Sequence, residues 1–183
     1  MATIIHTADI HLDSPLRNLP AYEGAPVETV RGAARRAFDA LIEETLSRPA
    51  DLLLISGDLY DGDWQDYNTG LYFASRMARL KEAGIPVCII AGNHDAESRM
   101  TRTLRLPENV HLLPADRPGT VRLDRIGVAV HGQGFSAPAV RNNLASRYPD
   151  GLPGYLNIGM LHTCATGRER SEEHTSELQS RQS

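Results

Sequence analysis

Three short apolar runs in the first half of the chain predict buried β-strands, because each is rich in β-branched or other aliphatic residues. The runs are Thr3–His6, Leu52–Ser56 and Pro86–Ala91. Between them, apolar residues recur at helical spacing over about Val27–Ser47 and about Tyr67–Ala83. This alternation of strands and helices predicts βαβ units around a largely parallel sheet.

The pattern changes after Leu104, where short strand candidates follow one another without long helices between them. We therefore expect a second, more antiparallel sheet from Val110–Leu113, Thr120–Leu123 and Gly127–His131. A further strand candidate, Leu156–Leu161, follows a stretch rich in proline and glycine. Gly84 lies where a glycine commonly ends a helix, so it predicts the end of the second helix.

Composition and charge limit the class of protein. The chain has 183 residues and a formal net charge of −4, a length that suits one domain. The negative balance argues mildly against nucleic-acid binding over a broad face, although metal ions or a short basic segment can supply positive charge. No signal peptide and no membrane span is expected from the apolar stretches. Cys88 and Cys164 suggest no disulfide framework, so we expect a cytoplasmic, reduced protein.

Each of the three clear strands leads into a polar motif. The motifs are Asp9-Ile10-His11, Gly57-Asp58-Leu59-Tyr60-Asp61 and Gly92-Asn93-His94-Asp95. Ligand sites in open α/β sheets lie outside the carboxyl ends of the strands, so we expect the motifs to converge. Such Asp, His and Asn sets suit Mn²⁺, Fe²⁺ or Zn²⁺, and a carboxylate can bridge two ions in phosphoryl transfer. Each motif alone also occurs in ordinary turns, but all three in order favour a metal site.

This motif order resembles the calcineurin-like metallophosphoesterase superfamily. Longer stretches resemble its DNA-repair exonuclease branch, the SbcD- and YhaO-like proteins. These stretches are His6-Thr7-Ala8-Asp9-Ile10-His11-Leu12-Asp13-Ser14-Pro15-Leu16, Gly57-Asp58-Leu59-Tyr60-Asp61-Gly62 and Leu161-His162-Thr163. The resemblance covers about Met1–Arg168. It implies an α/β/β/α sandwich of two packed sheets flanked by helices, and a metal-dependent DNA exonuclease.

The resemblance also implies a ligand set for two divalent ions, with Mn²⁺ first and Fe²⁺ or Zn²⁺ as alternatives. Asp9 and His11 would hold the first ion, and Asp58 would bridge both ions. Asn93 and His162 would hold the second ion. For His162, spacing alone leaves a polar residue at a strand end as an equal alternative, and the local pattern of the family favours the ligand role.

Three further residues receive roles from the resemblance. His94 would be the general acid that protonates the leaving oxygen, and Asp95 would orient its imidazole. Asp61 would lie behind a ligand histidine and hold its ring in place.

The family pattern ends with a downstream Gly-His-x-His motif, and this sequence has none. We therefore expect the fold and site to be incomplete at the C-terminus, with each ion lacking one protein ligand. Residues Arg170–Ser180 also resemble, residue for residue, the translation of a sequencing adapter. We expect a truncated metallophosphoesterase domain over 1–169 and a non-native tail over 170–183, with a genuine disordered tail as the alternative.

Other side chains give weaker signals. Three arginines at helical spacing after the third motif are candidates for contacts with DNA phosphates, with a solvated basic face as the alternative: Arg99, Arg102 and Arg105. Tyr60 and Trp64 are candidates for stacking on a base, or else for closing a loop. Arg31 and Arg35 share a helix face and are interpreted as surface charges.

Three functions from different classes follow from these patterns. The first is a DNA nuclease with an SMC-like ATPase as the partner that the resemblance implies. The second is a phosphatase or cyclic-nucleotide phosphodiesterase of the same superfamily. The third is a metal-poor interaction scaffold, which the intact motif residues disfavour. No membrane partner is expected, and a homodimer is left open.

Overall fold

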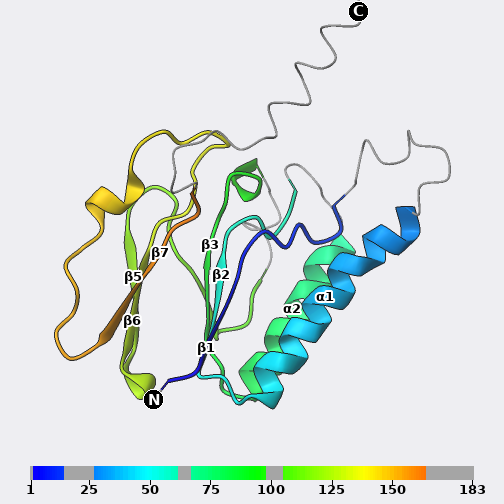
Figure 1. Cartoon of the computed structure of the whole chain (residues 1–183), viewed down its shortest axis with the longest axis horizontal. Coiled ribbons are helices and arrows are strands. Elements are labelled where there is room, and N and C mark those ends of the chain that lie inside the picture. The colour runs from blue at the N-terminus through cyan, green and yellow to red at the C-terminus, as the bar shows by residue number, and fades with distance from the viewer. Residues whose placement is uncertain (1, 15–26, 62–66, 98–104, 164–183) are drawn as a thin grey trace, which may run out of the picture.

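The computed structural model describes residues 2–14, 27–61, 67–97 and 105–163. Within these residues two sheets are layered side by side, and two helices cover the outer face of the first sheet (Figure 1). The predicted α/β fold of two sheets with flanking helices is confirmed. The described ranges include three of the four layers of the α/β/β/α sandwich, and the predicted tail over 170–183 lies outside them.

The first sheet is entirely parallel, with the strand order β1-β2-β3-β4. Its strands are β1 (Ile4–Thr7), β2 (Leu52–Ser56), β3 (Val87–Ile90) and β4 (Val110–Leu112). The prediction for β4 was wrong about its sheet, because β4 pairs with β3 in parallel and not with the later strands. A parallel connection usually carries a long helix, and the described residues between β3 and β4 form only a short 3₁₀ turn at Asp95–Glu97. In the sequence of this segment only three arginines follow helical spacing, and no long apolar pattern of helical period indicated the crossover.

The second sheet has the order β5-β6-β7. Its strands are β5 (Gly119–Leu123), β6 (Val128–Gly132) and β7 (Leu156–Met160). The β5–β6 pair is antiparallel, as predicted, whereas β6 and β7 run parallel. The parallel pairing of β7 directs its C-terminal end, and hence His162, toward the side of the molecule where the motifs lie.

The two helices are α1 (Val27–Ser47) and α2 (Tyr67–Glu82), close to their predicted bounds. Gly84 ends α2 as expected: its φ is 70°, and its N–H donates to the Lys81 carbonyl at 2.9 Å. The Ile85 N–H donates to the Leu80 carbonyl at 2.9 Å, which completes a Schellman motif. In the part of the chain that the structure describes, no helix combines the length and hydrophobicity of a membrane span.

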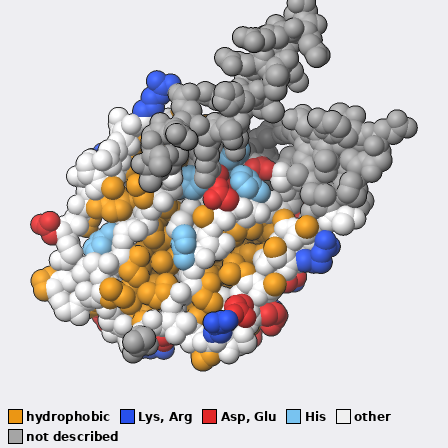
Figure 2. All heavy atoms as spheres, in the orientation of Figure 1, with side chains coloured by type: hydrophobic (Ala, Val, Ile, Leu, Met, Phe, Trp, Pro, Cys, Tyr) orange, Lys and Arg blue, Asp and Glu red, His pale blue; other side chains and the backbone are white. Residues whose placement is uncertain are grey.

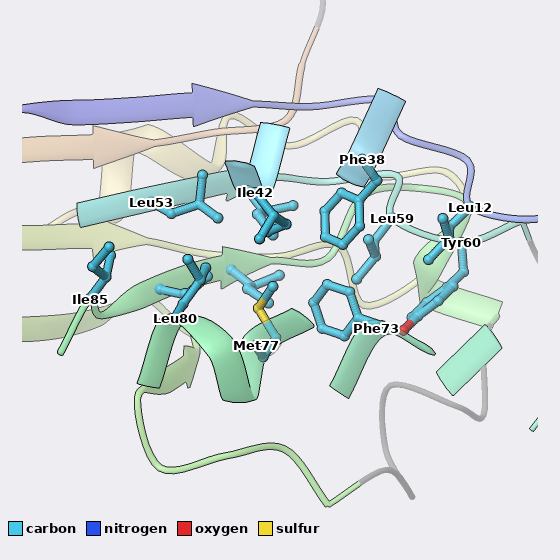
Figure 3. Packing of buried hydrophobic residues seen from close by; sticks show 13 residues of the cluster. Leu12, Phe38, Ile42, Leu53, Leu59, Tyr60, Phe73, Met77, Leu80 and Ile85 are labelled. Carbon is cyan, nitrogen blue, oxygen red and sulfur yellow. The ribbon is translucent and has the colours of Figure 1, made fainter. Parts of the chain in front are cut away.

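Two apolar cores hold the layers together. One lies between the helices and the first sheet, where Phe38 and Phe73 stack at 5.7 Å (Figure 3). The other lies between the sheets and includes Cys88 and Val130. Alternate β2 residues face each core, so the whole strand is buried, which explains its continuous apolar sequence.

Tyr60 belongs to the first core and is not available for stacking on a base. Its side chain is 1% exposed, and its ring meets the Phe73 ring edge-on at 6.1 Å (Figure 3). Burial raises the pKa of its phenol well above the ordinary tyrosine value, so the group stays protonated. The base-stacking prediction is therefore wrong for Tyr60, and Trp64 lies outside the described residues.

Candidate metal centre

The three strand-end motifs converge, as the parallel strands predicted. Backbone hydrogen bonds join the first motif loop to the second: Asp9 N–H to the Gly57 carbonyl at 3.1 Å, and His11 N–H to the Asp58 carbonyl at 3.0 Å. On the face seen in Figure 2, histidine and carboxylate side chains lie together at the end where β1 finishes in Figure 1. The first two loops therefore form one structural unit.

Two glycines allow the loops to approach one another. A Cβ on Gly57 would lie 2.5 Å from His162 Nδ1 and 2.9 Å from Gly92 Cα. A Cβ on Gly92 would lie 2.1 Å from Asp58 Oδ1. These distances are well below van der Waals contact, so the site requires glycine at both positions.

The first cluster of ligand-type atoms belongs to Asp9, Asp58 and His162, all within 4.8 Å of one another. His162 Nε2 lies 3.3 Å from Asp58 Oδ2 and 3.1 Å from Asn93 Oδ1. Its Nδ1 faces the Ser56 carbonyl at 2.9 Å. A carbonyl oxygen only accepts, so we assign a proton to Nδ1, and Nε2 is directed at the carboxylate. The hydrogen bond with Asp58 raises the pKa of His162 above its ordinary value.

Asp58 lies at the centre of the site and is fully buried. Its Oδ1 accepts the His94 backbone N–H at 3.1 Å, and its Oδ2 lies 3.9 Å from His11 Nε2. Burial acts to raise the pKa of Asp58, but the hydrogen bond and charge of His162 outweigh it and hold the pKa below its ordinary value. A carboxylate between two imidazoles is placed where it could contact two metal ions.

The second cluster consists of His11, Asp61 and His94. Asp61 Oδ1 lies 2.6 Å from His11 Nδ1 and 3.4 Å from His94 Nδ1. The two rings meet edge-on at 5.1 Å. The mutual hydrogen bond raises the pKa of His11 and lowers that of Asp61. Because this bond occupies His11 Nδ1 and leaves Nε2 facing Asp58, the cluster is better explained as orienting the rings than as holding an ion.

Asp95 does not have the contacts predicted for it. Its Oδ2 accepts the N–H groups of Leu59 at 3.1 Å and Gly92 at 2.9 Å, and its Oδ1 accepts the Tyr60 N–H at 2.8 Å. Among the described residues, no hydrogen bond joins this carboxylate to the His94 ring. Burial raises the pKa of Asp95 even though the three amides lower it. Asp95 therefore braces the second and third motif loops, and Asp61 is the carboxylate beside His94.

Some contacts at the site had no signal in the sequence. The Phe135 ring meets the His162 ring edge-on at 5.8 Å, and it comes from an irregular segment after β6 where no periodicity identifies a partner. The Ser56 carbonyl that orients His162 is a backbone group, which sequence patterns do not distinguish. Arg105 is exposed, whereas Arg99 and Arg102 lie outside the described residues.

The donor set fits divalent cations. Asp58 is buried close to Asp9, and His11, Asn93 and His162 direct nitrogen or oxygen atoms toward the same region. Burying a carboxylate beside another is costly unless positive charge compensates it. Mixed carboxylate, amide and imidazole donors suit Mn²⁺, Fe²⁺ or Zn²⁺.

Comparisons with known proteins agree with this chemistry. The family described as calcineurin-like phosphoesterase matches residues 2–152. The uncharacterized metallophosphoesterase YhaO of Bacillus subtilis is 33% identical over 174 residues, which cover 91% of this chain and 42% of YhaO. The DNA double-strand break repair protein Mre11 of Methanopyrus kandleri is 36% identical over 95 residues, covering 51% of this chain and 19% of that protein. Mre11 of Sulfurisphaera tokodaii is 32% identical over 98 residues, which cover 54% of this chain and 23% of that protein. The chain thus spans less than half the length of each of these relatives.

Proposed function

Because the chain belongs to the calcineurin-like phosphoesterase family, we propose that it hydrolyses DNA phosphodiester bonds as an exonuclease in DNA repair, using two divalent metal ions. The observation that carries the proposal is the grouping of Asp9, Asp58 and His162, with His94 and Asp61 directly beside them. DNA is favoured as the substrate because two relatives are named as DNA double-strand break repair proteins. Mn²⁺ is the ion we propose, with Fe²⁺ or Zn²⁺ as alternatives.

The ligand assignment is the one that the family resemblance implies. We assign Asp9 and His11 Nε2 to one ion, and Asn93 Oδ1 and His162 Nε2 to the other. Asp58 lies between the two histidines and would bridge the ions. Bound ions would supply the positive charge that polarises the phosphoryl group.

His94 is the residue we assign to proton transfer. Asp61 Oδ1 lies 3.4 Å from His94 Nδ1, which orients the ring. The proton on Nε2 is then the one that passes to the leaving oxygen, and Asp61 rather than Asp95 orients the ring. A positioned general acid typically contributes about 10²–10⁴-fold to the rate.

Two assays distinguish the candidate functions. Release of nucleotides from linear DNA is compared with hydrolysis of p-nitrophenyl phosphate, a phosphomonoester, both with Mn²⁺. The protein to be assayed is the longest native polypeptide that contains residues 1–169, because the chain spans 42% of YhaO. Nucleotide release without phosphomonoester hydrolysis supports the proposal, and the reverse supports the phosphatase alternative. A protein that binds Mn²⁺ and hydrolyses neither substrate contradicts both. The SMC-like ATPase partner stays a prediction that co-purification with the native polypeptide would test.

A further inference from the structure

The loop that carries Asp9 and His11 follows an unusual backbone path. Asp9, His11 and Asp13 have φ values of 54°, 46° and 54°, in the left-handed region that residues other than glycine seldom adopt. Such conformations cost free energy and persist only where neighbouring structure holds them. Hydrogen bonds to the second motif loop hold one side of this path. The other side must be held by contacts of the loop with the rest of the fold.

Asp13 makes those contacts. Its carboxylate accepts from Arg35 Nε at 2.7 and 3.0 Å and also from the terminal nitrogen of the same guanidinium. It accepts from Thr69 Oγ1 at 2.6 Å as well. Arg35 belongs to α1, and Thr69, which is fully buried, belongs to α2. Next to Asp13, the Leu12 side chain is fully buried in the first core. One carboxylate therefore connects the ligand loop to both helices.

Arg35 is itself held in position. Its guanidinium lies 4.7 Å from the centre of the Tyr72 ring, and the Tyr72 hydroxyl lies 2.9 Å from the Arg35 carbonyl oxygen. The same hydroxyl lies 2.8 Å from Asp39 Oδ1. A guanidinium that packs on an aromatic ring and donates two parallel N–H···O bonds to a carboxylate fixes the orientation of that carboxylate. The interpretation of Arg35 as a plain surface charge is therefore wrong.

We propose that Asp13 is a positioning residue, which fastens the loop bearing Asp9 and His11 to α1 and α2 through Arg35 and Thr69 and so holds both ligands at the metal centre. The effect on metal binding rests on the proposed function, because Asp9 and His11 are ligands only if the site binds ions. The contact itself predicts a measurable effect without metal or DNA. Groups that orient metal ligands typically change metal affinity by about 10–100-fold when they are replaced.

The test compares Asp13→Asn with Glu43→Gln in the full chain. Glu43 also pairs with an arginine between α1 and α2, because its Oε1 lies 2.7 Å from Arg79 Nη1, and among the described residues no hydrogen bond or ion pair joins Glu43 to the ligand loop, Arg35 or Tyr72. Hydrogen exchange is measured on a peptide covering residues 8–14 and on one covering β3, and Mn²⁺ affinity is measured by titration with electron paramagnetic resonance detection.

Asp13→Asn should exchange faster in residues 8–14 but not in β3, and should bind Mn²⁺ about tenfold or more weakly. Glu43→Gln should match the unmodified chain in both. Unchanged exchange and affinity in Asp13→Asn, or equal losses in Glu43→Gln, would overturn the inference. If Asp13→Asn does not fold, Thr69→Val removes a single contact, and unchanged exchange of residues 8–14 in that variant also overturns it. The expected exchange pattern in a chain without nuclease activity would refute the proposed function and leave the positioning role supported.

Discussion

Replacing Asp95 by asparagine should lower the free energy of unfolding, because this carboxylate braces two loops. It accepts three backbone N–H groups, from Leu59, Tyr60 and Gly92, at 2.8 to 3.1 Å. All three donors belong to buried residues, so water cannot readily replace the acceptor. If Asp95 only oriented His94, the same substitution would reduce turnover and leave stability unchanged.

The size of the effect follows from these contacts. The asparagine oxygen can stay at the Oδ2 position and keep the bonds from Leu59 and Gly92, but its amide then faces the Tyr60 N–H, donor against donor. A hydrogen bond to a charged group contributes about 1.5–3 kcal/mol, and a buried donor left without an acceptor costs about 1–3 kcal/mol. Removing the ionised form offsets part of this loss, because burial raises the pKa of Asp95. We expect a net loss of about 1–3 kcal/mol, a substantial share of a typical stability of about 5–15 kcal/mol.

Urea unfolding followed by circular dichroism measures this loss by linear extrapolation. Asp51→Asn is the control, because Asp51 Oδ2 accepts the Thr3 N–H at 2.8 Å near the surface and its loss should cost less than about 1 kcal/mol. Asp95→Ala should be destabilised further, because all three amides lose their acceptor. An Asp95→Asn chain as stable as the unmodified one would refute the bracing role.

Three further outcomes are expected. His94→Ala should keep its metal and lose about 10²–10⁴-fold in turnover, whereas Asp58→Ala should lose metal and turnover together; equal metal content in the two would contradict our division of roles. Elemental analysis after dialysis against trace Mn²⁺ should find fewer than two ions per chain, because the Gly-His-x-His motif that the resemblance implies is absent from this sequence; two tightly held ions would show that it is not needed. The hydrogen bond from Arg76 lowers the pKa of Asp39. The Asp39–Arg76 pair therefore stabilises the fold above the ordinary aspartate pKa, and this stabilisation is lost as the pH falls through the lowered pKa of Asp39. Acid unfolding curves between about pH 5 and 2 should therefore be flatter for Asp39→Asn, and superimposable curves would show that this pair contributes nothing.

Much of the fold could be predicted because its strands are buried on both faces. A strand such as Leu52–Ser56 has no polar side to interrupt its apolar run, so its bounds are visible in the sequence. Parallel strands also bring their carboxyl ends to one edge of the sheet, which is why the position of Asp58 and His94 at a common site followed from their place along the chain.

Other features depend on contacts that no local pattern encodes. The strand Val110–Leu112 joins the first sheet, but no long apolar pattern of helical period precedes it in the sequence, so it resembled the later strands. Arg35 has a helical spacing typical of a surface charge, but its partner Asp13 lies 22 positions earlier, in an irregular loop. Asp95 follows His94 directly, and only the loop geometry shows that its oxygens face backbone amides instead.

The bond between His162 and the Ser56 carbonyl joins positions 106 residues apart, and this separation has a consequence for the order of folding. Closing so long a segment costs chain entropy before any contact repays it, and contacts of this kind usually form slowly. The centre is therefore complete only after the second sheet has docked on the first, so an ion cannot assist the earlier steps. Mn²⁺ should slow unfolding and leave the refolding rate unchanged in stopped-flow experiments, and faster refolding with Mn²⁺ would show that the histidine arrives before the rate-limiting step.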